Sequence, residues 1–248
     1  MANSKFLIGR NTNIYVAPAG LSNGDVPGNG NDNSTTALDN KWTATVDALA
    51  AKGATTITLT VGSGIPAGST VIPANTYLNF VDANGVSVPV QVTAEADPTA
   101  AEVVSLTVAA LVADVPAGAT ATYPTFVALR NSANIGLNGN RINFFAFEDG
   151  GHESGTNATI STSLSLGGNF AATDAGFLNI QYLYEQFCQA YFFVELSASD
   201  DRFQRGVVYQ GLGTITSITT DIPSDNFITG AVEAAFDEAP LKYDQDPT

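Results

Sequence analysis

The clearest pattern along the chain is the alternation of polar and apolar residues over 159–166, which read Thr-Ile-Ser-Thr-Ser-Leu-Ser-Leu. Because side chains of a strand point alternately to its two faces, this pattern predicts a strand with one buried and one solvated face. A neighbouring strand is predicted over 141–147, and the polar segment 148–157 between the two is expected to be a loop. Further strands are expected over 6–8, 13–17, 126–130, 188–196, 203–209, 211–218 and 227–236.

One segment has helical periodicity instead. Its apolar residues recur at three- and four-residue spacing, which places them on one stripe: Ala175, Leu178, Tyr182, Leu183 and Phe187. Thr173 or Asp174 is expected to cap the first turn. The pattern predicts a single amphipathic helix in an otherwise strand-rich chain.

Residues 42–124 carry a pattern of their own. A β-branched run followed by a turn with Pro and Gly occurs twice, first over 58–70 and again over 105–120. Between the two copies, the runs 77–81 and 86–92 are joined by Asn84-Gly85, which is typical of a β-hairpin. We expect this segment to be an inserted, small all-β domain with its own core.

The remaining segments complete the predicted organisation. Residues 1–41 and 125–240 are assigned to the main β core, with a long exposed loop over 20–40 that is rich in Gly, Asn, Asp and Ser. Residues 241–248 are expected to be a flexible acidic tail. The predicted fold class is all-β dominated, of sandwich or barrel type, with one flanking α-helix and the inserted domain.

Charge narrows the possible functions. The 248 residues include 9 Lys and Arg against 24 Asp and Glu, which gives a formal net charge of −15. A protein that binds nucleic acid or an anionic membrane through its charge needs a basic surface, so both classes are disfavoured. Only 13% of residues are charged and 44% are hydrophobic, which is the composition of a folded chain and not of a disordered acidic one.

The chain offers few residues for catalysis. His152 is its only histidine and Cys188 its only cysteine, so a nucleophilic pair would have to use His152, and no intrachain disulfide can form. His152 lies among glycines and carboxylates in a segment that is best interpreted as a solvated loop, and Cys188 as a small core residue. No enzymatic activity, metal or cofactor is predicted.

Three other groups of residues have simpler structural explanations. Asn23 to Asp32 is loosely similar to a calcium loop but lacks its alternating ligands and closing glutamate. The glycines at 206, 211 and 213 are interpreted as strand breaks, because they do not open a helix that could bind phosphate. The carboxylate pairs 200–201 and 237–238 are interpreted as solvated edges.

No apolar run of signal-peptide or transmembrane length is found in the sequence. We therefore expect a protein that is made in the cytoplasm and has no membrane anchor.

The segment 203–236 resembles the C-terminal half of the major tail tube proteins of tailed bacteriophages, whose fold is shared with the inner tube of type VI secretion. The residues at matching positions are Arg205, Gly206, Ser217, Ile218, Pro223, Asp225, Thr229 and Val232. The order of the predicted elements agrees over residues 1–17 and 125–240. Residues 236–238 depart from the family, in which glycine often follows at this point.

The resemblance implies a structural virion protein that forms stacked hexameric rings, which are joined into the tail tube through which DNA is ejected. It implies that strands 141–147 and 158–166 line the lumen, with Arg141, Asn143, Thr159, Ser161, Ser163 and Ser165 as candidates. It further implies that the loop 148–157 reaches the next ring through Glu148, Asp149, His152 and Glu153.

The resemblance also implies particular partners. These are further copies of the chain, tail terminator, baseplate or tape measure proteins, a sheath in a contractile tail, and double-stranded DNA that passes without tight binding. The protein would be located in the virion after assembly in the host cytoplasm, with the insert on the tube exterior. A capsid decoration protein, or another β-rich virion surface protein, and a carbohydrate-binding β module remain as alternatives.

Overall fold

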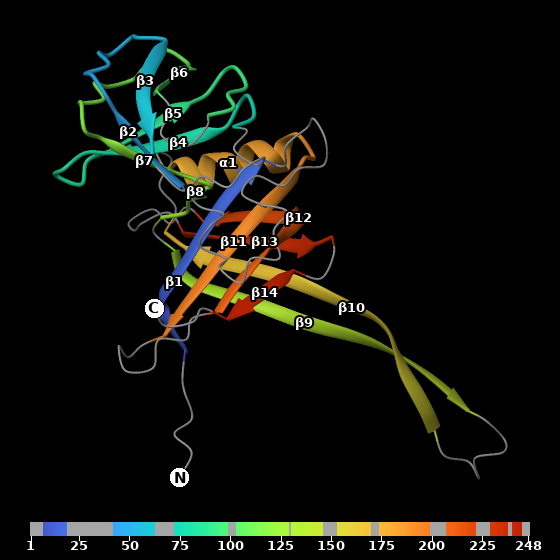
Figure 1. The fold of residues 1–248 in the computed structure, drawn as a ribbon. Coiled ribbons are helices and arrows are strands. Elements are labelled where there is room, and N and C mark those ends of the chain that lie inside the picture. The colour runs from blue at the N-terminus through green and yellow to red at the C-terminus, as the bar shows by residue number, and fades with distance from the viewer. Residues whose placement is uncertain are drawn as a thin grey trace.

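The computed structural model describes residues 7–18, 42–62, 72–98, 103–128, 130–145, 153–169, 174–198, 207–221, 229–237 and 240–244. These residues form two antiparallel sheets and one helix (Figure 1). The prediction of an all-β dominated fold with one flanking helix is confirmed. The calcium-like segment 23–32 and the carboxylate pair 200–201 lie outside the described residues.

The larger sheet has the strand order β8-β1-β11-β12-β13-β10-β9, and β14 also pairs with β12. Its strands are β1 (Leu7–Pro18), β8 (Thr125–Phe126), β9 (Arg130–Phe145), β10 (Glu153–Gly168), β11 (Gln189–Ala198), β12 (Val207–Asp221), β13 (Thr229–Phe236) and β14 (Leu241–Asp244). In Figure 1, β1 and β11 cross the direction of β9 and β10, as expected for a strongly twisted sheet.

Several predicted boundaries are wrong. The two short strands expected near the N-terminus are one strand, β1, whose register with β11 shifts between Leu7 and Thr12. The two strands expected over 203–218 are likewise one strand, β12. The described part of the tail expected to be flexible forms β14, which pairs residue by residue from Leu241 to Asp244 with β12. Strand pairing satisfies backbone groups that a free tail would leave to water.

Glycines 211 and 213 lie inside β12 and do not break it. A Cβ at Gly213 would lie 2.7 Å from the backbone oxygen of Ala235, and one at Gly211 would lie 3.3 Å from the ring of Phe236. Both glycines therefore allow β13 and the Phe236 ring to approach the strand closely, which is a packing role.

One face of the larger sheet carries the main core. The buried residues of this face come from five strands, from the helix and from Val127, which directly follows β8: Ile14, Val16, Val127, Leu164, Leu166, Phe177, Ile180, Leu183, Ala190, Phe192, Val194, Ile215, Val232, Ala234 and Phe236. The alternation predicted over 161–166 is observed, since Thr162, Leu164 and Leu166 are buried and the serines between them are not. On the opposite face, Tyr15, Tyr191 and Phe193 form a separate buried aromatic cluster.

The smaller sheet lies at one end of the larger one, beyond the helix (Figure 1). Its strand order is β5-β4-β7-β2-β3-β6, formed by β2 (Trp42–Val46), β3 (Thr56–Val61), β4 (Tyr77–Val81), β5 (Ser87–Gln91), β6 (Val103–Thr107) and β7 (Thr120–Tyr123). The two copies of the repeated pattern pair with each other as β3 and β6. A second core, which includes Ile57, Leu59, Phe80 and Leu106, lies between its strands and loops.

The hairpin predicted at Asn84-Gly85 joins β4 and β5. Gly85 has φ +80°, a left-handed conformation that glycine adopts without steric cost. The Asp82 carboxylate accepts hydrogen bonds from the backbone N–H groups of Asn84 (2.9 Å) and Val86 (2.8 Å). These bonds fix the turn that the sequence pattern predicts.

The helix α1 spans Ala175–Glu185, and its N-cap is Asp174, one of the two predicted caps. Its buried residues are Ala175, Gly176, Phe177, Asn179, Ile180 and Leu183. The predicted stripe is therefore partly wrong: Leu178 and Tyr182 are half-buried, and Phe187 lies beyond the helix with 92% of its surface exposed. The buried arc is wide because α1 contacts both the larger sheet and β4 of the smaller one.

Candidate functional site

The face of the larger sheet opposite α1 is solvated along β12, β13, β10 and β9, and we call this surface the polar face. The register places Asn134, Ser165 and Glu233 side by side on three neighbouring strands. The residues of the polar face are small and mostly neutral, and they include Ser132, Asn134, Ser161, Ser163, Ser165, Thr214, Ser217, Thr219, Thr229, Ala231, Glu233 and Ala235. Among these residues Glu233 carries the only charge, and its carboxylate accepts a hydrogen bond from Ser165 Oγ at 2.7 Å.

Three of the six predicted lumen residues lie together on the polar face: Ser161, Ser163 and Ser165. Thr159 lies further along β10, where it pairs with Asn140. Arg141 and Asn143 lie in β9, opposite Asn157 and Gly155 of β10. The side chains of Thr159, Arg141 and Asn143 are outside the described part of the structure.

The predicted loop between these strands is shorter than expected. β9 ends at Phe145 and β10 begins at Glu153, so Glu153 to Asn157 belong to a strand and not to a loop. Glu153 pairs with Phe145, while Glu148, Asp149 and His152 lie outside the described residues.

The residues that carry the family resemblance divide between the two faces of the sheet. Ser217 and Thr229 lie on the polar face, whereas Val232 is buried in the main core and Ile218 packs against that core. Arg205, Gly206, Pro223 and Asp225 lie outside the described residues. The described motif residues therefore build the sheet and its solvated surface, and they do not converge on a pocket.

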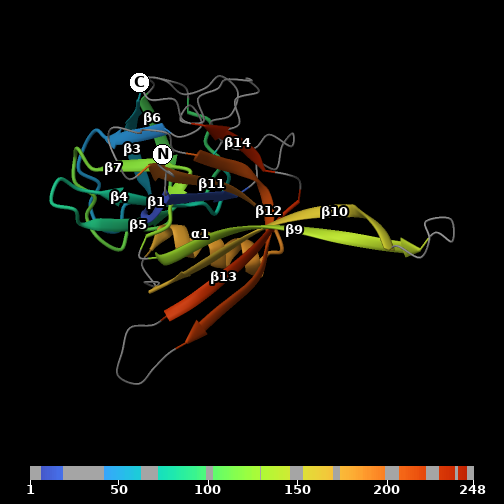
Figure 2. The same ribbon diagram turned by 90° about the horizontal axis from the view of Figure 1, so that it is seen from below.

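The hairpin of β9 and β10 extends well past the rest of the sheet (Figures 1 and 2). β13 pairs with β10 only from Ser163 to Gly168, whereas β9 pairs with β10 from Glu153 to Gly168. Within the described residues, the hairpin is therefore two-stranded beyond Thr162. We call this two-stranded part, residues 137–145 and 153–162, the ribbon.

The larger sheet has open edges on both sides. β9 is the last strand of the sheet order, so among the described strands its 16 residues pair with β10 alone. On the other side, β8 covers only Tyr15 and Val16 of β1, which leaves the first part of β1 without a second described neighbour. Unpaired edges of this length invite pairing with another chain.

A clamp of partly buried hydrogen bonds, which the sequence analysis did not predict, joins α1 to the smaller sheet. The Asn179 side chain is fully buried; its Oδ1 accepts from the Tyr77 N–H at 2.7 Å, and its Nδ2 donates to the Tyr77 carbonyl at 2.8 Å. Thr125 Oγ1 donates to the same carbonyl at 2.7 Å, and Asn75 Nδ2 donates to the Tyr182 hydroxyl at 3.1 Å. The sequence signal was a polar residue, Asn179, between the apolar positions of a helix.

Two ionisable groups have shifted pKa values, and both have structural causes. The backbone N–H of Val86, with those of Asn84 and Gly85, lowers the pKa of the Asp82 carboxyl. Burial raises the pKa of the Tyr123 hydroxyl far above its ordinary value. The described residues contain no group of three or more His, Cys, Asp or Glu that could hold a metal ion.

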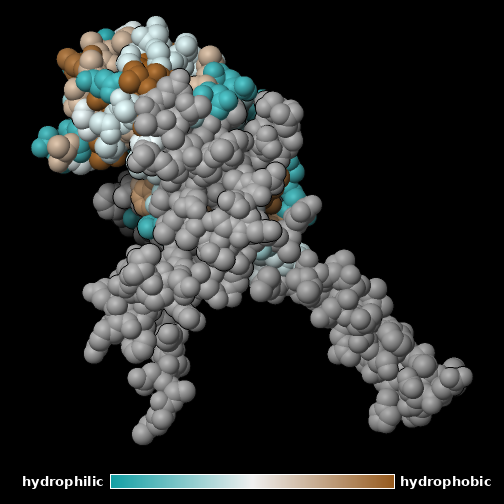
Figure 3. Space-filling view, viewed as in Figure 1, coloured by the Kyte–Doolittle hydropathy of each residue, from teal (hydrophilic) through white to brown (hydrophobic). Residues whose placement is uncertain are grey.

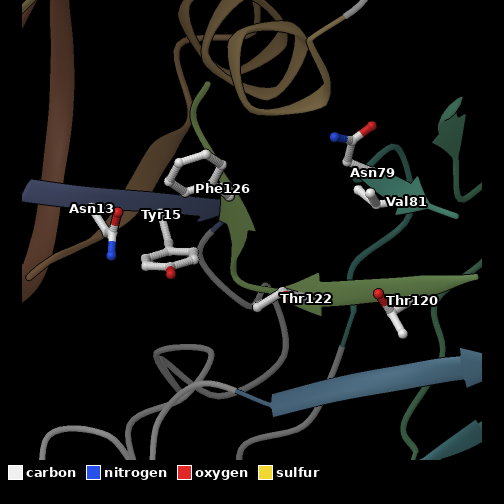
Figure 4. A pocket seen from close by; sticks show the side chains of 7 residues that line it. All are labelled: Asn13, Tyr15, Asn79, Val81, Thr120, Thr122 and Phe126. Atoms are coloured by element: carbon white, nitrogen blue, oxygen red, sulfur yellow. The ribbon is translucent and has the colours of Figure 1, made fainter. Parts of the chain in front are cut away.

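A pocket of about 310 Å³ opens where the two sheets meet (Figure 4). Its described walls come from β1 and β8 (Asn13, Tyr15, Phe126), β4 (Asn79, Val81) and β7 (Thr120, Thr122). The rings of Tyr15 and Phe126 are 5.5 Å apart between centroids and inclined by 56°. All of these side chains are neutral, so the pocket has aromatic walls and uncharged polar groups.

No family model and no curated protein matches the chain. A structure described as the tail of an empty gene transfer agent particle with C6 symmetry is similar to 46% of this chain and 82% of its own, at 19% identity and a TM-score of 0.39. A structure of the virion of a native gene transfer agent particle is similar over 48% and 87%, at 18% identity and the same TM-score. In the described part of the chain, no helix is long and apolar enough to cross a membrane.

Proposed function

We propose that the chain is a structural virion protein that polymerises as stacked hexameric rings into a phage-type tail tube. The observation that carries the proposal is the ribbon. An isolated two-stranded hairpin is marginally stable in water. The segment 137–162 is rich in Gly, Asn, Ser and Thr, and its larger apolar residues are concentrated over 142–147, so a two-stranded hairpin has no second layer of its own on which to bury them. Contacts with further copies of the chain would supply the missing stabilisation.

The open edges of the sheet favour a closed ring. The β9 edge and the uncovered part of β1 lie on opposite sides of one sheet, so the two surfaces are different. Contacts between unlike surfaces produce a closed ring when the rotation from one copy to the next divides a full turn evenly, and they produce a filament when it does not. The resemblance of residues 203–236 to tail tube proteins supports six copies in each ring.

The polar face suits the wall of a DNA channel. A basic surface would hold DNA, because neutralising phosphates releases counterions. The residues named for the polar face include no Lys or Arg, and the register adds Asp221, opposite Thr229, to Glu233, so both of these charges are negative. A lumen lined by Ser161, Ser163 and Ser165 would hydrate the passing duplex without retaining it.

The smaller sheet is then placed on the outside of the tube, with α1 between it and the larger sheet. The partners are those of a tail: terminator, baseplate and tape measure proteins, with a sheath if the tail contracts. The candidate loop residues Glu148, Asp149 and His152 would extend the ribbon toward the next ring.

The experiment removes the ribbon without disturbing the sheet. Replacing residues 138–161 with Asn-Gly joins Leu137 to Thr162, which are already paired, through a two-residue hairpin turn. We expect wild-type protein to form rings or tubes in sedimentation and electron microscopy, and the truncated variant to stay monomeric with a folded core. Val86→Ser, at an exposed position beside the β4–β5 turn, is the control and should assemble normally. Assembly of the truncated variant at wild-type concentrations would overturn the proposal.

A further inference from the structure

Exposed apolar side chains occur at several separate places on the described surface. Figure 3 shows hydrophobic patches over the smaller sheet, where Leu49, Val86, Val103 and Val112 are each about 60% exposed or slightly more. Phe187 differs from these in two respects. It is 92% exposed, and its φ is +54°, the left-handed conformation that non-glycine residues rarely adopt.

The conformation of Phe187 follows from how α1 ends. The Cys188 N–H donates to the Leu183 carbonyl, and the Phe187 N–H donates to the Tyr184 carbonyl. This pattern closes a helix with a left-handed residue at the position of Phe187, where glycine is usual because it has no Cβ to clash. A phenylalanine at this position adds steric strain to the monomer.

The ring of Phe187 does not offset this strain within its own chain. A side chain with 92% of its surface in water contributes almost no hydrophobic stabilisation, which is proportional to the area removed from water. Phe187 therefore strains the backbone of the monomer, and its exposed ring supplies no burial that would offset this strain. Burial of the ring against another molecule would supply the missing hydrophobic stabilisation.

We infer that Phe187 is an anchor that inserts into the pocket between the two sheets of a neighbouring copy of this chain. This inference rests on the proposed self-assembly. The pocket is open to solvent, and its volume of about 310 Å³ leaves room for a phenyl ring to enter from outside. Tyr15 and Phe126 offer ring edges and faces for a third aromatic ring, and the described lining contains no charged group that would have to be desolvated.

Phe187 and the pocket lie too far apart in one chain to touch, so the contact must join two copies of the chain. α1 begins beside β8, since a Cβ on Gly176 would lie 2.5 Å from the Phe126 carbonyl oxygen, and Phe126 lines the pocket. Phe187 follows the other end of this 11-residue helix, which is about 16 Å long at 1.5 Å per residue. Anchor and pocket thus lie at opposite ends of α1, and pairing them gives the unlike, head-to-tail contact that ring closure needs.

The test separates the strain of Phe187 from the contact of its ring. Phe187→Gly removes both, so the variant monomer should melt about 2–4 °C higher than wild type while its critical concentration for assembly rises at least about tenfold. Phe187→Ala keeps the left-handed non-glycine residue and should lose assembly without the gain in melting temperature. Leu49→Ala, at an exposed apolar position of the smaller sheet, is the matched control and should assemble like wild type.

A second variant tests the pocket. Thr120→Trp places a large side chain at the exposed rim of the pocket and should raise the critical concentration as Phe187→Gly does. If the two residues form one contact, the double variant should assemble no worse than either single variant, because the same interaction is lost once. Multiplied effects in the double variant would overturn the assignment of the pocket.

Failure of this inference is distinguishable from failure of the proposed function. Normal assembly of Phe187→Gly in a chain whose wild type forms tubes would overturn the anchor alone. A wild-type chain that forms no rings or tubes would overturn both.

Discussion

The clamp between α1 and the smaller sheet predicts how much stability the chain loses when Asn179 is replaced. In Asn179→Ala, both hydrogen bonds to the Tyr77 backbone are lost. The Tyr77 carbonyl keeps a partner, because Thr125 Oγ1 still donates to it. The Tyr77 N–H loses its acceptor at a position that the helix covers, so it is the group left without a hydrogen bond.

The two losses have different magnitudes. Removing the acceptor of the Tyr77 N–H costs about 1–3 kcal/mol. The bond from Asn179 Nδ2 to the Tyr77 carbonyl contributes about 1 kcal/mol net. Together they lower the free energy of unfolding by about 3 kcal/mol, which corresponds to a fall in melting temperature of roughly 6–12 °C for a chain of this size.

Urea denaturation followed by circular dichroism measures this change, with Glu185→Ala as the control. Glu185 is an exposed residue in the last turn of the same helix, where a negative charge is unfavourable, so its replacement should be neutral or slightly stabilising. A loss below about 0.5 kcal/mol for Asn179→Ala would refute the reasoning, because it would lie within the range of ordinary surface substitutions.

Three further predictions concern local features of the fold. Gly213→Ala should lower the free energy of unfolding by about 1–3 kcal/mol, since its Cβ would lie 2.7 Å from a carbonyl oxygen of β13; an unchanged denaturation midpoint would count against this packing. Asp174→Ala removes the acceptor of three backbone N–H groups, two in α1 and that of Ala128. The free energy of unfolding should therefore fall by about 2 kcal/mol in the same assay, and Asp174→Asn should recover part of this loss. The pKa of Asp82 is lowered chiefly by the Val86 N–H, so its stabilising effect should be present above the ordinary carboxyl pKa near 3.8 and lost as pH falls through the lower folded value. Asp82→Asn should flatten the dependence of melting temperature on pH in that acidic range, and an unchanged slope would contradict the assignment.

Local patterns predicted those elements whose signal is carried by neighbouring residues. The alternation of Ser163, Leu164, Ser165 and Leu166 fixes which side of β10 is buried, and the structure has this arrangement. Asp174 and the Asn84-Gly85 turn were also predicted correctly, because a cap and a tight turn depend on a few adjacent residues.

Contacts between distant segments could not be predicted in this way. The helix stripe was partly wrong because β4, about 100 residues earlier in the chain, covers a second side of α1 and buries Asn179. Gly213 was interpreted as a strand break, since nothing in its neighbourhood indicates the approach of β13. Phe187 was assigned to the apolar stripe, and its left-handed conformation depends on where the helix ends.

For the candidate site, the sequence predicted which side of β10 is solvated, but not how far its hairpin with β9 extends. The polar face contains Ser161, Ser163 and Ser165, which the alternation had placed on one solvated side. The sequence did not indicate that the hairpin of β9 and β10 would extend beyond its neighbours, because the end of β13 determines where the sheet stops.

Electron microscopy of the purified full-length chain, over a range of protein and salt concentrations, tests the central claim most directly. The proposed function predicts hollow rings with six copies, stacked into tubes whose inner wall is formed by the strands β9 and β10. Particles that remain monodisperse monomers under every condition, while circular dichroism shows a folded chain, would contradict it.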